Sequence, residues 1–410
     1  HEDILEQADE TDAVFGELYS WYLRNPEYRS RVQKLVQSAF AGKPEDIISQ
    51  SVAKALYGEV SPYSATRLER FAACAFAHFL QYGMKLTERV EYEFKPMDMG
   101  NVMHEALESF AEEVRKRGMK WTELTEQERN EIADRCLDNI VADYGNTVLK
   151  SSARNEYMIE RTRRILRRTV WALQKQLEQG EFQPEGFEVT FGGGRIDRVD
   201  IMEDQNKVYV KVIDYKTGNT SFDLVYLYHG LQLQLMIYLD GALRVEQKKY
   251  PDKEIIPAGV FYYNIKDPMI QEKIDADVEA VSAGLIKELK MNGLVQADPE
   301  LVYRMDSSLG SIPVAFNKDG SFRKNSSVAD RTQFAVLGRY VRTKIEKIRS
   351  SILEGDAEVS PYELGKKNAC TYCPYMTVCG FDRRLSGYEF RRLKNFSDEE
   401  LWKAFDREAE

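Results

Sequence analysis

Two aspartates and a lysine in the segment Gly194–Lys216 have the residue types and spacing of a metal-dependent phosphodiesterase site. The segment reads GRIDRVDIMEDQNKVYVKVIDYK, and the polar run at 203–206 predicts a hairpin turn in its middle. Alternate residues of a strand face the same side of a sheet, so Asp214 and Lys216 share one face of the second strand. Asp197 lies on the partner strand. We therefore expect two carboxylates and one ammonium group to converge.

Such a group of side chains suits phosphate chemistry. Carboxylate oxygens bind hard cations such as Mg²⁺ or Mn²⁺, which keep several waters and accept substrate phosphate in the remaining positions. An ammonium group beside the cation can orient or deprotonate the attacking water, or neutralise charge that builds on the phosphorus. An isolated Asp-x-Lys is more often an edge strand with solvated charges. The second aspartate and the glycine run at 192–194, which permits close approach of backbone or substrate, favour the catalytic interpretation.

Two further segments carry groups that fit the same chemistry. In MDMGNVMHEALESFAEEVRKRG, His104 lies on one helical stripe with Leu107 and Ala111, so it is either a satisfied core histidine or a metal ligand. Gln234 and Tyr238 stand four residues apart in LYHGLQLQLMIYLDGAL and share one face of an expected helix. They could bind phosphate without adding charge, or form only the polar rim of a helix.

The order of these motifs resembles the RecB-type branch of the PD-(D/E)xK nucleases. The matching segments are, in chain order, Gly100-x-x-x-His104, GRIDRVD at 194–200, VIDYKTG at 212–218 and Gln234-x-x-x-Tyr238. The resemblance implies an α/β, restriction-endonuclease-like fold, in which helices wrap a mixed central sheet and form insertions. It also implies a Mg²⁺-dependent deoxyribonuclease, with Mn²⁺ as the alternative ion.

The same resemblance assigns a role to each matching residue. It implies that the metal ligands are His104, Asp197, Asp214 and the backbone carbonyl of Tyr215. It further implies that Lys216 is the catalytic lysine and that Gln234 and Tyr238 contact or position the DNA. Glu188, just upstream in FEVTFGGG, is a weaker candidate for supporting the site.

The cysteines predict a second centre. Cys370, Cys373 and Cys379 read Cys-x2-Cys-x5-Cys, and Cys74, about three hundred residues earlier, is the candidate for a fourth thiolate. Four thiolates can hold Zn²⁺ or a [4Fe–4S] cluster, and the spacing does not distinguish these two. The odd number of cysteines, together with no signal peptide or spanning apolar stretch in the sequence, predicts a reducing cytoplasmic location without membrane contact.

The cysteine pattern resembles a narrower group, the iron–sulfur nuclease domains of AddB-type subunits in bacterial AddAB helicase–nucleases. The segments that carry this resemblance are YSATRLERFAACAFAHFLQYGMKL and NACTYCPYMTVCGFD. It implies a [4Fe–4S] cluster on Cys74, Cys370, Cys373 and Cys379, with Cys136 as a structural thiol outside it. Such a cluster would be a structural staple that clasps both ends of the nuclease domain.

The AddB-type resemblance also implies a cellular role. The substrate would be DNA, as single strands or duplex ends, and the partner an AddA-type helicase–nuclease subunit. The process would be resection of double-strand breaks for recombinational repair, with an exonuclease that cuts the strand ending 5′. No Walker-type Gly-x4-Gly-Lys-[Ser/Thr] motif occurs in the sequence, so we expect any ATP hydrolysis to belong to the partner.

Length and charge bound the organisation of the chain. With 410 residues and a net charge of −10, the chain is not coated in basic surface, so DNA contacts must use local patches. The basic runs at 160–169 and 384–397 are candidates, and each could also be a solvated helix face. We expect an acidic helical leader over 1–62 from a preceding helicase-like domain, the nuclease domain with its cluster over 63–385, and a C-terminal helical tail over 386–410.

Periodicity and turn signals predict the elements between these bounds. The expected order is a cysteine helix from Tyr63, a helical block at 100–180, a catalytic sheet at 187–218, the Gln234 helix, a strand at 258–265, a helix at 275–291, a hairpin with an Asp-Gly turn in IPVAFNKDGSFRK and a helix at 327–353.

Two other functions remain compatible with the sequence. One is a stand-alone relative such as the CRISPR-associated adaptation nuclease, which shares the iron–sulfur arrangement but is typically much shorter. The other is a catalytically silent DNA-binding scaffold held by zinc. The presence of Asp197, Asp214 and Lys216 together disfavours the scaffold, since a silent protein could lose any of them.

Overall fold

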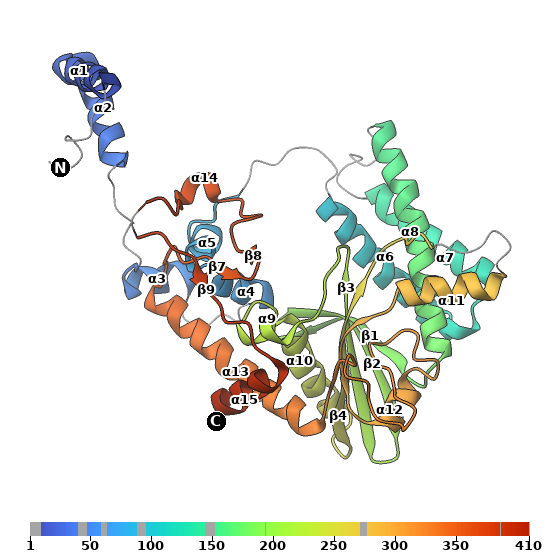
Figure 1. Ribbon diagram of the computed structural model, residues 1–410. Coiled ribbons are helices and arrows are strands. Elements are labelled where there is room, and N and C mark those ends of the chain that lie inside the picture. The colour runs from blue at the N-terminus through green and yellow to red at the C-terminus, as the bar shows by residue number, and fades with distance from the viewer. Residues whose placement is uncertain are drawn as a thin grey trace.

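A six-stranded mixed sheet forms the centre of the computed structural model (Figure 1), which describes residues 10–39, 47–58, 64–87, 96–143, 152–192, 194–270, 277–385 and 387–409. The strands lie side by side in chain order: β1 (Gln183–Phe191), β2 (Gly194–Asp204), β3 (Lys207–Lys216), β4 (Glu254–Asn264), β5 (Asn292–Gln296) and β6 (Val328–Ala329). The β3–β4 and β5–β6 pairs are parallel and the other pairs antiparallel. The expected α/β class with a mixed sheet is confirmed.

Helices cover both faces of this sheet. On one face lie α6 (Pro96–Lys116), α7 (Glu126–Asp143), α8 (Ala153–Glu178) and α12 (Pro299–Met305). On the other lie α3 (Gln50–Tyr57), α4 (Ala65–Ala73), α10 (Gln234–Lys249), α13 (Arg331–Glu354) and α15 (Asp398–Ala409). The shorter or outlying helices are α1 (Glu10–Arg24), α2 (Pro26–Ala39), α5 (Ala75–His78), α9 (Leu224–Tyr228), α11 (Val278–Glu288) and α14 (Met376–Cys379). Two hydrophobic cores result, one between each helical layer and the sheet.

The β2–β3 hairpin forms because both of its faces become buried. Val210 and Val212 pack into the core beneath α10, while Tyr209 and Ile213 pack into the core beneath α6. A strand that is apolar on both faces needs cover on both faces, and the two helical layers supply it. The turn is tighter than the expected run at 203–206, because the strands continue until only residues 205–206 connect them.

Several elements differ from the expectations. Gln234 begins α10 instead of standing inside a longer helix, and the residues before it form α9. The expected hairpin in IPVAFNKDGSFRK is a tight turn with one isolated bridge, Phe316 to Phe322. The sequence did not predict the strand β5 and the helix α12: α12 is shorter than two helical turns, and β5, at five residues, is too short for its periodicity to stand out.

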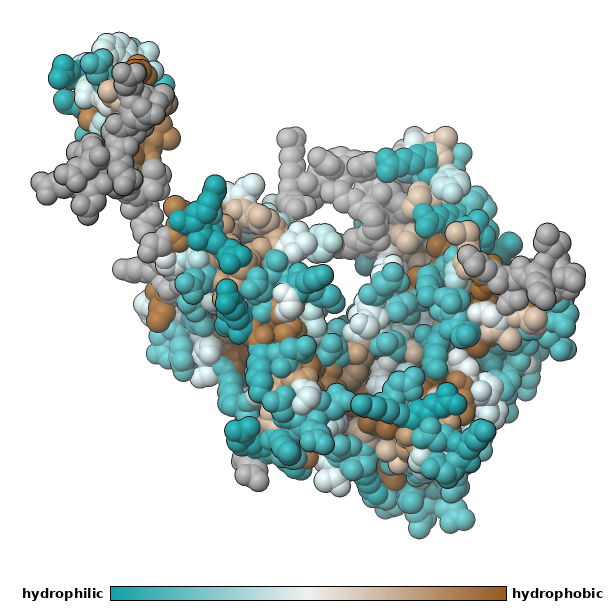
Figure 2. All heavy atoms as spheres, viewed as in Figure 1, coloured by the Kyte–Doolittle hydropathy of each residue, from teal (hydrophilic) through white to brown (hydrophobic). Residues whose placement is uncertain are grey.

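Segments expected to lie outside the nuclease domain also pack against it. Ala53 and Tyr57 of α3, and Leu401 and Phe405 of α15, are buried in the core that contains α13. The helices α1 and α2 pack on each other. Hydrophilic residues cover most of the surface seen in Figure 2, while apolar residues show on the α1–α2 pair. Within the described residues, no helix has both the length and the apolar character needed to cross a membrane.

Candidate active site

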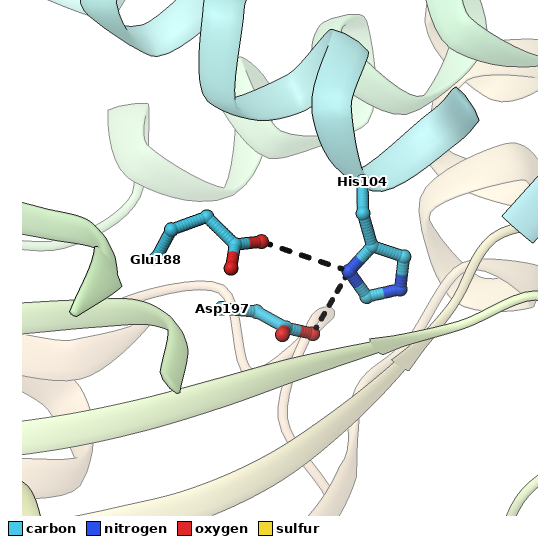
Figure 3. Close-up of side chains that lie close together, drawn as sticks. All are labelled: His104, Glu188 and Asp197. Atoms are coloured by element: carbon cyan, nitrogen blue, oxygen red, sulfur yellow. Dashed lines mark ion pairs between the residues drawn. The ribbon is translucent and has the colours of Figure 1, made fainter. Parts of the chain in front are cut away.

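An irregularity in the β1–β2 pair directs two carboxylates away from the sheet. Phe187 packs against the core beneath α6, whereas Val189, two residues later, packs against the opposite core. Between them Glu188 has φ +49, a left-handed conformation that non-glycine residues rarely adopt and that often marks a functional site. Asp197 lies opposite on β2. Both carboxylates turn toward α6 (Figure 3).

These two carboxylates meet the imidazole of His104. The Nδ1 atom of His104 lies 3.4 Å from Oδ2 of Asp197 and 3.9 Å from Oε1 of Glu188. One donor atom from each of the three residues lies within 4.8 Å of the others. The ring of His104 also makes an edge contact with Tyr215, at 6.0 Å between centroids. One imidazole nitrogen and two carboxylates form a donor set that a divalent cation could bind.

The strand β3 contributes a second group of contacts. Nζ of Lys216 lies 2.6 Å from Oδ2 of Asp214 and donates a 2.7 Å hydrogen bond to Oε1 of Gln234. Nε2 of Gln234 in turn donates to the hydroxyl of Tyr238 at 2.9 Å. The lysine is thereby held between β3 and the first turn of α10.

A backbone contact joins the two groups. The backbone N–H of Tyr215 donates a 2.7 Å hydrogen bond to Oδ2 of Asp197, the same oxygen that faces His104. Asp197 therefore lies between the imidazole on α6 and the strand that carries Asp214 and Lys216. The site is built from one helix on each face of the sheet and the strand pair between them.

The charges at the site are poorly compensated. Burial raises the pKa of Asp214 to about 7, and the charge of Asp197 adds to the rise while Lys216 opposes it. Burial and the charge of Asp197 likewise raise the pKa of Glu188 to about 7, against the effect of Arg195. Burial lowers the pKa of His104, but its contact with Asp197 outweighs burial and leaves that pKa raised. A bound cation would stabilise the ionised form of carboxylates whose pKa is raised this far.

The structure brings most of the predicted residues together, but the three donors beside one another are not the three predicted side-chain ligands. Asp214 does not belong to the set of three donors, and its Oδ2 atom faces Nζ of Lys216. Glu188, only a weak candidate from the sequence, takes that place beside His104 and Asp197. The Tyr215 carbonyl remains a predicted ligand.

Sequence reasoning missed one buried acid, Glu69 on α4. Its Oε1 atom accepts hydrogen bonds from the backbone N–H groups of Leu233, at 2.7 Å, and Gln234, at 2.9 Å. Burial raises the pKa of Glu69 to about 7, although these two bonds oppose the rise. The carboxylate thus fixes the start of α10, where Gln234 contacts Lys216. Its partners lie 164 and 165 residues away, so no local pattern could have identified it.

The second aspartate of the GRIDRVD motif serves the fold and not the donor set. Asp200 is completely buried and accepts two bonds from Arg198, at 2.5 and 2.9 Å. Lys211 of β3 lies 3.0 Å from the same carboxylate. The guanidinium of Arg198 also lies over the rings of Trp121 and Phe187. This charge cluster ties β2 to β3 on the face covered by α6.

Four of the five cysteines surround one pocket. Cys74 lies between α4 and α5, and it lines this pocket together with Cys370, Cys373 and Cys379. Burial raises the pKa of Cys370 to about 12, and the nearby charges of the other three thiols add to that rise. Cys136 lies apart, in the core beneath α6. Four soft thiol donors around a pocket fit a metal centre in kind and number.

Known proteins with similar sequences agree with this geometry. The family model of the PD-(D/E)XK nuclease superfamily matches residues 62–380. Curated relatives are named as the B-type subunits of an ATP-dependent helicase/deoxyribonuclease. The relative from Lachnoclostridium phytofermentans is 41% identical over 99% of this chain, and those from a Thermoanaerobacter species and from Clostridium acetobutylicum are 34% and 33% identical over 98%. The chain spans 37% of the length of each of these relatives.

Proposed function

The chain belongs to the PD-(D/E)XK nuclease superfamily, and from this premise we propose that it is a divalent-metal-dependent DNA exonuclease domain of a helicase–nuclease. The observation that carries the proposal is the meeting of Asp197 with His104 and Glu188 on one side and with the Asp214–Lys216 strand on the other. Superfamily members use divalent metals, and the donor set here suits one. We take Mg²⁺ as the ion and Mn²⁺ as its substitute.

Each residue has a proposed role in phosphodiester hydrolysis. His104, Glu188 and Asp197 would hold the cation, with Asp214 and the Tyr215 carbonyl as further ligands. A bound cation would polarise the phosphate and lower the pKa of an attacking water. Nζ of Lys216 is held beside Asp214, where an ammonium group can orient that water or offset negative charge on the phosphate.

The helix α10 supports this arrangement. Gln234 accepts from Lys216 and donates to Tyr238, so the lysine cannot swing away without breaking a chain of hydrogen bonds. Burial raises the pKa of Tyr238 to about 12, which keeps its hydroxyl protonated at neutral pH. We propose that Gln234 and Tyr238 position the lysine and contact the DNA backbone.

We further propose that Cys74, Cys370, Cys373 and Cys379 hold a [4Fe–4S] cluster. All four cysteines line one pocket, and four thiols fit either a zinc ion or the cluster. The resemblance of the Cys-x2-Cys-x5-Cys spacing to that of iron–sulfur nucleases supports the cluster. We also propose a reducing, cytoplasmic location, which the odd number of cysteines supports.

The names of the relatives support the wider role. We propose that the chain is the nuclease portion of an AddB-type subunit that works with an AddA-type helicase–nuclease. The complex would resect double-strand breaks for recombinational repair, and this domain would cut the strand that ends 5′. In this proposal residues 63–385 form the main part of the nuclease domain, and α3 and α15, from the segments 1–62 and 386–410, complete one of its cores.

A cleavage assay tests the proposal. The 410-residue chain should degrade end-labelled single-stranded or duplex DNA with Mg²⁺ or Mn²⁺ and should be inactive in EDTA. Asp197→Asn should abolish the reaction, because it removes the carboxylate shared by both groups of contacts. Full activity in a folded Asp197→Asn protein would place the active site elsewhere.

A further inference from the structure

One face of α8 carries three arginines with an aromatic side chain at each end of the row. Tyr157, Arg161, Arg164, Arg168 and Trp171 follow one another at intervals of four, three, four and three residues, so they form one stripe along the helix. Fourteen residues of helix span about 21 Å. All five line a groove of about 530 Å³ between α7 and α8. We name these five residues the arginine stripe.

The stripe is basic and open to solvent. Arginines outnumber carboxylates in the groove by six to two. Tyr157 is 66% exposed, and so is the side chain of Arg164. Arg161 is exposed and has no acidic partner among the described residues. The contact of Arg164 with Asp267 uses only its Nε atom, at 2.5 Å, which leaves its two terminal amino groups for another ligand.

The other arginines of α8 have different surroundings. Arg163 lies 2.7 Å from Asp138, and Arg167 makes two bonds to Asp134 of α7. These two arginines hold α8 against α7. The run of basic residues at 160–169 therefore divides into Arg163 and Arg167, which pair with acids of α7, and the arginine stripe, in which Arg164 and Arg168 share the one carboxylate of Asp267.

Contacts connect the stripe to the catalytic strand. Arg164 binds Asp267, which lies two residues after Ile265. The backbone N–H of Ile265 donates a 2.7 Å bond to the carbonyl of Lys216. Two residues of extended chain reach at most about 7 Å. A strand of nucleic acid that lies on the stripe is thus close to the end of β3 where the site is.

We propose that the arginine stripe is a track for single-stranded DNA that leads to or from the active site. Arg161, Arg164 and Arg168 would contact successive phosphates, and Tyr157 and Trp171 would stack on bases. Arg168 already lies 5.2 Å over the ring of Trp171, which orients its guanidinium beside a stacking surface. The inference rests on the proposed function, since it assumes that the substrate is DNA, and it names the surface that selects a single strand.

The test measures binding to a fluorescent oligothymidylate by anisotropy, in EDTA so that nothing is cleaved. The variant is Arg161→Gln/Arg164→Gln/Arg168→Gln in the 410-residue chain. Each phosphate contact with a single strand contributes about 0.7 to the slope of log affinity against log salt. Loss of three contacts should lower that slope by about two and the affinity by at least about tenfold near physiological salt.

The control is Arg244→Gln/Arg342→Gln, which removes two exposed arginines that pair with Asp240 outside this groove and should leave the salt slope unchanged. Tyr157→Ala should weaken binding by a similar factor at every salt concentration, because stacking releases no counterions. A triple variant with wild-type affinity and slope would overturn the stripe. Because binding is measured without metal, a chain that fails to cleave DNA would still test the stripe, and the two proposals can fail separately.

Discussion

Two acidic residues near the site, Glu188 beside His104 and Glu69 beside Gln234, make the stability of the fold depend on pH. Glu188 and Glu69 have pKa values raised from 4.5 to about 7, in both cases chiefly by burial. Between about pH 4.5 and 7 the folded chain therefore holds protons that the unfolded chain has released. Stability must fall as pH rises through this window, and the loss is complete above pH 7. For Glu69 alone the rise corresponds to about 3 kcal/mol of free energy of unfolding.

We predict that divalent metal stabilises the chain more at high pH than at low pH. Metal ligands must be deprotonated to bind, so Mn²⁺ should raise the melting temperature more at about pH 8 than at about pH 5.5. Differential scanning fluorimetry with and without Mn²⁺ measures this. In Glu188→Gln, the melting temperature without metal should depend less on pH than in the wild type. Mn²⁺ should also raise the melting temperature of this variant by less. A shift from Mn²⁺ that is equal at both pH values would exclude Glu188 as a ligand.

The second prediction at this scale concerns the strand β3. Asp214→Ala or Lys216→Ala should lower cleavage by about 10²- to 10⁴-fold, as expected for a group that acts on the proton or charge of the reacting atoms. The fold should persist, because both residues lie at the end of the strand. Lys207→Ala is the control, since Lys207 is an exposed lysine at the other end of β3. An equal loss of cleavage in Lys216→Ala and Lys207→Ala would show that the loss comes from removing positive charge in general.

At the scale of elements, Glu69 connects three parts of the molecule. Its helix α4 ends at Cys74, its carboxylate binds the first turn of α10, and α10 presents Gln234 to Lys216. A carboxylate at a helix N-terminus satisfies N–H groups that otherwise lack a partner and also interacts well with the helix dipole. The helix that ends at Cys74 and the proposed catalytic lysine, Lys216, are thus linked through one helix cap.

We predict that at about pH 5, where Glu69 is protonated, Glu69→Ala destabilises the chain by about 1–2 kcal/mol through loss of the cap, and that it lowers cleavage because Gln234 shifts. Glu69→Gln keeps a carbonyl acceptor at the same position, so it should recover most of the activity. The same variant should also remove the part of the pH dependence of the free energy of unfolding that Glu69 contributes. Chemical denaturation at about pH 6 and pH 8, together with cleavage rates, separates these effects. A Glu69→Gln protein as inactive as Glu69→Ala would show that the charge is required.

Sequence could predict the elements whose signal is local. The β2–β3 hairpin is predictable because its alternation and turn lie within one short segment, and Asp197, Asp214 and Lys216 lie on it. Glu188 is only a weak candidate from the sequence, because its place beside His104 depends on a left-handed backbone conformation within β1. Glu69 escapes prediction altogether, because its role comes from packing between α4 and α10. Contacts between distant segments leave no periodic pattern in the chain.

At the scale of the whole molecule, the four cysteines connect segments from both ends of the chain. Cys74 follows α4, which packs in the core beneath α10. The other three cysteines lie between β8 (Lys367–Asn368) and β9 (Arg391–Arg392), the outer strands of a small sheet whose central strand is β7 (Tyr362–Leu364). Asn368 accepts bonds from the backbone N–H groups of Cys370 and Thr371, which fixes the start of the cysteine loop. A guanidinium of β9, that of Arg391, donates to the carbonyl of Ala72. The two ends are already adjacent through protein contacts.

The last prediction concerns the proposed cluster that would join these two segments. Changing any one of Cys74, Cys370, Cys373 or Cys379 to Ala should remove visible absorbance and iron and should lower the melting temperature, because a cubane cluster needs all four thiolates. A link across about three hundred residues restricts the unfolded chain by on the order of 5 kcal/mol in the chain-entropy model.

Cys136→Ala is the internal control, since this thiol is buried in the other core. It should keep the iron and the colour, and lose only the small packing contribution of one sulfur atom. Because the nuclease residues lie on β1, β2, β3 and α6, the cluster variants should first lose stability and DNA binding, and lose cleavage only as a consequence. Iron and sulfide analysis of anaerobically purified protein decides the identity of the centre. A colourless protein with one zinc ion per chain would refute the iron–sulfur cluster while leaving the nuclease site intact.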